Sequence, residues 1–242
     1  MTAQEFTDVD LSGSRFRDVR LHHVVMTGVE LAHVRIDGEI KDVVINDVDV
    51  TAYIEEELDR RDPDRPRMRP TDPQGFREAW DLVERRWEET LARARRLDRA
   101  LLDESVDGEW SFIQTLRHLT FATDSWVSRA ILGEPTPWHR LGLPWSTAPE
   151  IPGWDGDPQA RPTLEEVLEA RRDRMATVRG YLAGLTEEAL DADTEPVDAP
   201  GWPPPESFPV RECLLIVLNE EYHHRRFAER DLAVLEQRAG VS

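Results

Sequence analysis

The sequence contains very little cysteine. Cys213 is the only cysteine among 242 residues, which excludes an internal disulfide and any metal site built from several cysteines. A single thiol in a chain of this length agrees with a reducing compartment. We expect Cys213 to act as a small buried apolar residue.

Long hydrophobic runs are also missing. No stretch of about 18 apolar residues is present, and the first residues, MTAQEFTDVD, lack the basic and apolar regions of a signal peptide. We therefore expect a cytoplasmic protein. With 39% hydrophobic residues, the chain is long enough for one good core and a small second module.

Lysine is almost absent, since Lys41 is the only one and arginine supplies every other cation. The formal net charge of -19 would repel phosphate backbones and anionic lipids. Binding to nucleic acid or to membranes is therefore disfavoured, although a protein that imitates DNA stays open. Arginine is the available anchor for carboxylate groups on a ligand.

An apolar residue recurs at every fifth position near the start of the chain, a period that fits neither a helix nor a flat strand. The series is Phe6, Leu11, Phe16, Leu21, Met26, Leu31 and Ile36. Over residues 4–50 the pattern resembles the pentapeptide-repeat family, which implies a short right-handed β-helix with the central Phe or Leu pointing inward. Stacked repeats need roughly three units to bury a continuous core. Residues 1–52 should therefore lean on the second module or on another subunit.

The rest of the chain predicts a mainly α fold. Residues 53–72 are charged and contain prolines, so we expect an exposed connector there. Residues 73–242 carry apolar residues at helical spacing. The first expected helix covers about residues 73–97 and the last about residues 209–237. The second begins at the capping box Ser111–Gln114 and the third at the capping box Thr163–Glu166. Four such helices predict a four-helix bundle, and the Trp- and Pro-rich connections between them should form ordered lids.

The last predicted helix carries polar residues where burial should continue. Counted at helical spacing, Glu220 and His224 share a stripe with Cys213, Val217 and Ala228. Burying both polar groups without a shared partner would be costly. His118, at the edge of the apolar face of the second helix, would complete a set of two imidazoles and one carboxylate. Such a set suits a divalent metal such as zinc or nickel and leaves room for water or substrate.

Other interpretations of these residues stay open. His118 could be a hydrogen-bonded structural residue, and Glu220 with His224 could form a surface pair if the helical register is shifted by one. Glu221 and His223 compete with their neighbours for the same roles. The stripe that contains Glu221 ends in charged residues, so its C-terminal half should face outward.

Several remaining side chains are expected to lie outside any metal site. His22, His23 and His33 occupy positions of the repeat that do not point inward and should be solvated. His139, in a Trp-rich loop, could face the pocket, but a surface role is expected. Asp124 follows His118 by six residues, a rise of about 9 Å along a helix, so it should not be a ligand but should either support the site from outside the ligand set or serve in helix packing.

The motifs WSFIQTLRHL, FATDSW, ILG and LNEEYHHRRFAERDLAVLE resemble the DinB-like superfamily of four-helix metalloproteins, over about residues 73–237. Within that superfamily the motifs resemble the actinobacterial branch related to mycothiol-dependent maleylpyruvate isomerase. The resemblance implies that His118, Glu220 and His224 are the metal ligands. Asn219 with His223 has the same spacing, but an asparagine departs from the usual His or Glu of the family.

The resemblance also implies a function. We expect a metal-dependent thiol transferase or isomerase that activates mycothiol or another low-molecular-weight thiol against an electrophile, with Arg171, Trp110 and Arg226 near the substrate. No catalytic residue is assigned. A metal-dependent hydrolase is one alternative, and a non-enzymatic acidic interaction protein that uses the repeat segment is another. The expected partners are a small thiol and an electrophile, without nucleic acid or membrane, and a homodimer is one expected assembly.

Overall fold

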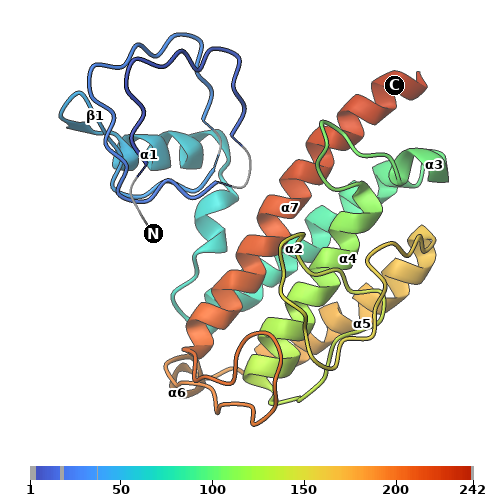
Figure 1. Cartoon of the computed structure of the whole chain (residues 1–242). Coiled ribbons are helices and arrows are strands. Elements are labelled where there is room, and N and C mark those ends of the chain that lie inside the picture. The colour runs from blue at the N-terminus through green and yellow to red at the C-terminus, as the bar shows by residue number, and fades with distance from the viewer. Residues whose placement is uncertain (1–3, 17–18, 37, 241–242) are drawn as a thin grey trace. The chain divides into compact units, whose positions relative to one another are not determined.

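A computed structural model describes residues 4–16, 19–36 and 38–240. The chain divides into two compact units, Met1–Thr51 and Ala52–Ser242, and we describe each by itself (Figure 1). The first unit ends in a short hairpin, in which β1 (Val44–Ile45) pairs antiparallel with β2 (Val48–Asp49). Asn46 and Asp47 connect the strands with φ angles of 49° and 63°, as a two-residue type I′ turn requires.

The backbone of the first unit turns at intervals that follow the sequence repeat. Positive φ angles occur at Asp8, Gly13, His23, Gly28 and His33, which are five or ten residues apart. The hairpin is nevertheless the only β-ladder among the described residues of this unit. The structure therefore does not show the expected β-helix, which stays a prediction.

The apolar residues of the repeat do not form a closed core among the described residues of the first unit. Phe6 is 69% exposed, Leu11 48% and Leu21 56%, although the resemblance implied that they point inward. A segment of only about two coils has too few neighbouring coils to cover them. The prediction that the histidines of the repeat are solvated is confirmed, because His22, His23 and His33 are all exposed.

Residues 53–72, expected as an exposed connector, are mostly folded. They contain nearly all of helix α1 (Thr51–Arg61) and the 3₁₀ turn η1 (Arg65–Met68). Arg65 ties the two together through ion pairs with Glu55 and Asp59, at 2.7 and 2.5 Å. Met68 is only 6% exposed and belongs to the main core. The prolines of this stretch therefore shape a packed turn, because Pro66 supplies the fixed φ at the start of η1.

Four long helices form the second unit, as the sequence predicted. They are α2 (Pro73–Ala94), α4 (Phe112–Thr123), α5 (Leu164–Ala183) and α7 (Val210–Ala239), with two short helices, α3 (Arg99–Leu102) and α6 (Glu187–Leu190), between them. Both predicted capping boxes are present, at the starts of α4 and α5. α4 continues into the π-helix η2 (Asp124–Ile131). The core lies between the helices and contains Phe76, Trp80, Leu116, Val167 and Leu232, each no more than 1% exposed.

The two long connections pack against the bundle and so behave as the ordered lids that were predicted. A second apolar cluster contains Phe121 from α4 and Trp138 and Ile151 from the connection between η2 and α5. Gly201, in the connection between α6 and α7, passes so close to Trp138 that a Cβ atom at this position would overlap the indole ring. These contacts hold both connections over one end of α4.

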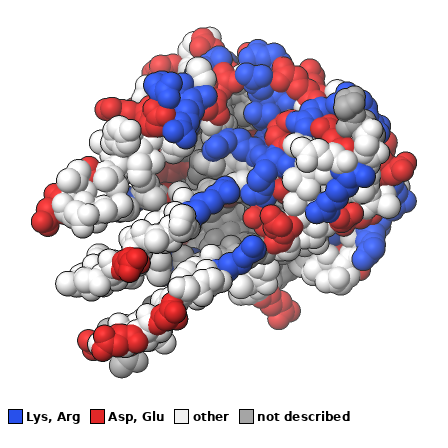
Figure 2. All heavy atoms as spheres, turned by 90° about the horizontal axis from the view of Figure 1, so that it is seen from above, with Lys and Arg blue, Asp and Glu red and all other residues white. Residues whose placement is uncertain are grey.

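Charges of both signs are interspersed on the surface. Figure 2 shows arginine and acidic side chains side by side over much of the visible face. Ion pairs join neighbouring helices, for example Arg93 of α2 with Glu236 of α7 and Arg179 of α5 with Asp81 of α2. Among the residues that the structure describes, no helix combines the length and apolar character needed to cross a membrane.

Candidate metal centre

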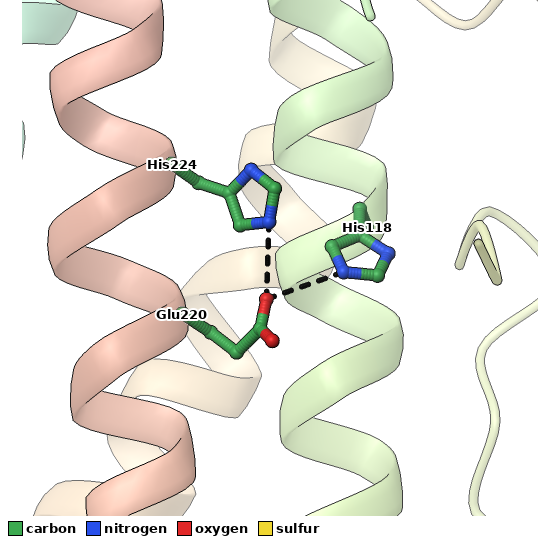
Figure 3. A group of neighbouring side chains, drawn as sticks. All are labelled: His118, Glu220 and His224. Carbon is green, nitrogen blue, oxygen red and sulfur yellow. Dashed lines mark hydrogen bonds and ion pairs between the residues drawn. The ribbon is translucent and has the colours of Figure 1, made fainter. Parts of the chain in front are cut away.

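Helix α7 provides two side chains to one cluster. Glu220 and His224 are one helical turn apart, so both side chains project from the same face of α7 toward α4 (Figure 3). Cys213 and Val217, on the preceding turns of the stripe, are 0% and 2% exposed. These two residues of the predicted stripe therefore lie on a buried side of α7. Glu220 and His224 themselves are half-buried, and their side chains are 33% and 19% exposed.

Glu221 is also buried, and here the sequence-based expectation was wrong. Its stripe was expected to face outward in its C-terminal half, yet Glu221 is only 1% exposed. Arg171 of α5 explains this, because one guanidinium nitrogen lies 2.9 and 3.1 Å from the two carboxylate oxygens. The guanidinium also lies over the ring of Trp87, 5.1 Å from its centroid. α7 thus buries two neighbouring stripes, one facing α4 and the other facing the core of the bundle, where Glu221 meets Arg171 of α5.

Helix α4 provides the third side chain of the cluster. His118 is 8% exposed, and its Nδ1 lies 2.9 Å from the carbonyl oxygen of Leu143. Because a carbonyl oxygen can only accept a hydrogen bond, Nδ1 carries the proton and donates it. Nε2 is then the ring atom directed at Glu220, 3.3 Å from Oε2. In the neutral ring this nitrogen holds a free lone pair, the form in which histidine binds a metal.

The three side chains converge closely enough to share one ion. Nε2 of His224 lies 3.0 Å from Oε2 of Glu220, and one ligand atom from each of the three residues lies within 4.8 Å of the others. Ligands placed about 2.0–2.2 Å from zinc in a tetrahedral site are roughly 3.4 Å apart. The carboxylate is close to that separation from both imidazoles. Small side-chain shifts would therefore be enough for the cluster to hold a divalent metal.

The electrostatics of the cluster favour an ionised carboxylate. Burial alone would raise the pKa of Glu220, but the hydrogen bonds that His118 and His224 donate when both rings are protonated, together with their positive charge, outweigh it and hold that pKa well below its usual range. Glu220 is therefore charged at neutral pH. A carboxylate beside two imidazole nitrogens is a site with one negative charge and suitable donors, which fits a cation placed between them.

Aromatic side chains form a wall beside the cluster. The ring centroid of Trp110 lies 4.4 Å from that of His118 and 5.7 Å from that of His224. Phe227 adds an edge contact with His224 at 6.0 Å. Trp110 is half-buried, whereas Phe227 is exposed. The predicted substrate residue Trp110 therefore lies directly against two of the three candidate ligands.

The structure does not bring the other predicted substrate residues to the cluster. Arg171 lies in the core, where Glu221 occupies its guanidinium. Arg226 is exposed and lies over the ring of Tyr222. Neither residue contacts a candidate ligand among the described interactions.

The neighbouring residues that competed for ligand roles also lie outside the cluster. His223 packs against Tyr222 and Phe227, and burial lowers its pKa, with a further contribution from nearby Arg226.

Asp124 is 1% exposed, accepts hydrogen bonds from Arg174 of α5 and from the backbone N–H of His139, and so joins α5 and a lid to η2. This contact agrees with the helix-packing role predicted for Asp124. His139 is half-buried, and burial lowers its pKa.

One residue beside the site was not singled out from the sequence. Arg117 is 1% exposed and binds backbone carbonyls of the lid that also provides the carbonyl of Leu143. The only signal in the sequence is an arginine within the apolar run FIQTLRHLTF. Its partners are main-chain atoms, which leave no mark in the side-chain pattern.

Comparison with protein-family models places this site in a known framework. Residues 82–228 match the model of the DinB superfamily, and the chain therefore belongs to that superfamily. The matched span includes His118, Glu220 and His224. The chain has no significant match among curated proteins or among solved structures.

Proposed function

We propose that this chain is a divalent-metal-dependent enzyme in which His118, Glu220 and His224 hold the metal. The convergence of these three side chains is the observation that carries the proposal. Membership of the DinB superfamily, which includes metal-dependent enzymes, supports it. A bound zinc or nickel ion would lower the pKa of a thiol or water molecule and so supply a nucleophile near neutral pH.

Two properties of the side chains favour a reactive site over a structural one. Structural zinc sites are closed by four protein ligands, whereas catalytic sites leave a position for water or substrate. The described residues provide three ligands here. Glu220 and His224 also keep part of their surface exposed, so the cluster is within reach of solvent. Trp110 would form one wall for a small molecule that binds there.

We further propose that the nucleophile is a low-molecular-weight thiol of the mycothiol type and that the reaction is S-transfer or isomerisation. One carboxylate compensates only one of the two charges of a divalent ion, so the site keeps a positive charge that favours an anionic thiolate. The resemblance of the α4 and α7 motifs to thiol-dependent isomerases supports the choice of a thiol.

Metal analysis tests the ligand assignment without presuming a substrate. The wild-type protein should contain roughly one zinc or nickel ion per chain after dialysis against a metal buffer, and His118→Ala and Glu220→Gln should not. His223→Ala is the matched control, because His223 lies beside His224 on α7 but outside the cluster. Metal that persists in His118→Ala, or that disappears only in His223→Ala, would overturn the assignment.

A kinetic comparison tests the chemistry. The metal-loaded protein should either consume thiol in the presence of an activated alkene, measured as the loss of free thiol, or isomerise a cis activated alkene only when thiol is present, measured by the absorbance of the alkene. Glu220→Gln should do neither. An ester hydrolysed without any thiol, again only by the loaded wild type, would support a metal-dependent hydrolase and refute the thiol proposal. Activity with neither substrate class, in a protein that binds metal, would leave the ligand assignment standing and remove the proposed reaction.

A further inference from the structure

Arg117 is a buried cation that makes its hydrogen bonds to main-chain atoms. It is 1% exposed, and burial of an arginine is costly unless its donors are satisfied. Nε donates to the carbonyl of Leu141 at 2.9 Å, and the terminal nitrogens donate to the carbonyls of Asp157, Pro158 and Ala160 at 2.6, 3.2 and 2.8 Å. One side chain of α4 thus binds two separate stretches of the same lid.

Two more hydrogen bonds join the lid to α4 at the same place. The backbone N–H of Leu143 donates to the carbonyl of Arg117 at 3.1 Å, and the carbonyl of Leu143 accepts from Nδ1 of His118 at 2.9 Å. Three hydrogen bonds therefore join Leu141 and Leu143 to two consecutive residues of α4. Any shift of the lid at this point would move the acceptor of the His118 ring.

Gly142 shows how closely the lid approaches the helix. A Cβ atom at Gly142 would lie 3.0 Å from the carbonyl oxygen of His139 and 3.4 Å from Cβ of Phe121. The first of these contacts, with the backbone of the lid itself, is tighter than a Cβ atom normally makes, so glycine allows the close turn of the lid that lies against Phe121 of α4. The position of the Leu143 carbonyl is thus set by the backbone on one side and by the guanidinium of Arg117 on the other.

We propose that Arg117 is a positioning residue for His118. By anchoring Leu141 to α4 it holds the Leu143 carbonyl at Nδ1–H, and this fixes the ring so that Nε2 is directed at Glu220. The inference rests on the proposed metal site only in that Nε2 is taken as the ligand atom. Partners of this kind, which orient a ligand without touching the metal, typically contribute about 10–100-fold in metal affinity.

Arg129 provides a matched control. It is also 1% exposed and also binds backbone carbonyls of the long connections, at Pro135, Ala199 and Pro203. None of these carbonyls is bonded to a member of the metal cluster in the described structure. Arg129→Lys should therefore disturb the lids as much as Arg117→Lys does, without affecting the ring of His118.

Two measurements on the full-length protein test the proposal. The first is the ¹H–¹⁵N signal of the His118 Nδ1–H in the metal-free protein, assigned by its absence from His118→Gln. Wild type and Arg129→Lys should show a slowly exchanging proton, and Arg117→Lys should not. The second is zinc affinity from competition with a chromophoric chelator, which should fall about 10–100-fold in Arg117→Lys and stay unchanged in Arg129→Lys.

The possible results separate the two proposals. The positioning role would be overturned if Arg117→Lys and Arg129→Lys lost the His118 signal and the zinc affinity equally. It would also be overturned if both quantities were unchanged in Arg117→Lys. If the wild type binds no zinc and the Nδ1–H signal disappears only in Arg117→Lys, the metal site is refuted, whereas the positioning of His118 by Arg117 stands. If Arg117→Lys does not fold, Gly142→Ala tests the same link, because it should displace the lid and remove the same signal.

Discussion

Replacement of Glu221 by methionine should destabilise the helical unit strongly without removing a metal ligand. The carboxylate of Glu221 is fully buried and the side chain of Arg171 is 6% exposed, so the single variant leaves a guanidinium in the core without its counter-charge. Breaking a buried ion pair from one side typically costs about 3–5 kcal/mol in the free energy of unfolding. This is a large part of the stability of an ordinary domain.

The double variant Glu221→Met/Arg171→Met should recover most of that loss. Replacing both charges by apolar side chains of similar size is often neutral, because the cost of burying the charges disappears with their attraction. A deficit of roughly 1 kcal/mol should remain, since the guanidinium of Arg171 no longer lies over the ring of Trp87. The coupling energy of this pair should therefore exceed about 2 kcal/mol.

Urea unfolding of the metal-free proteins, followed by far-ultraviolet circular dichroism, measures these free energies by linear extrapolation. Metal content of the double variant is measured in parallel and should equal that of wild type, because Glu221 and Arg171 lie outside the cluster. A loss below about 1 kcal/mol in Glu221→Met would refute the idea of a desolvated pair. A folded double variant without metal would show that Glu221 takes part in the metal site.

Three further outcomes follow from the structure. Burial raises the pKa of Cys213 to about 12, so this thiol should not react with Ellman's reagent at pH 8 until urea unfolds the chain; rapid reaction of the folded protein would contradict the burial of that stripe. Removal of residues 1–50 should leave metal stoichiometry unchanged, because all three candidate ligands lie in the second unit; a folded truncated protein without metal would show a shared site. Asp124→Asn should lower the unfolding free energy by about 1–3 kcal/mol through loss of its charge-assisted contact with Arg174, while its metal content stays that of wild type.

The bundle could be predicted from the sequence because its signals are local. Ser111 and Thr163 are each followed three residues later by a side chain that completes a capping box, and the turn-by-turn spacing of apolar residues gives the inward face. The cluster was predicted for the same reason, since Glu220 and His224 are one turn apart. Only the pairing with His118 joins distant parts of the chain, and that pairing came from the resemblance and the helix faces.

The role of Glu221 could not be obtained in this way. Its partner Arg171 lies 50 residues away on another helix, and a sequence pattern contains no information on which helices become neighbours. The folding of the α1 segment was not predicted for a related reason. Its prolines suggested an exposed connector, whereas the contacts of Arg65 with Glu55 and Asp59 span six to ten residues and fold the stretch into a helix and a turn.

The consecutive acids of α7 show how one helix can serve two purposes. Successive residues differ by about 100° around a helix axis, so Glu220 faces α4 and Glu221 faces the core of the bundle. Glu220 meets two imidazoles and stays within reach of solvent, an environment suited to a metal. Glu221 meets one arginine in a closed core, an environment suited to holding α7 at a fixed rotation. Since both acids lie on the same rigid helix, burial of position 221, by the ion pair with Arg171 or by an apolar pair of similar size, also keeps Glu220 and His224 facing α4. The stability of the core and the geometry of the candidate metal centre are thereby linked through a single turn of α7.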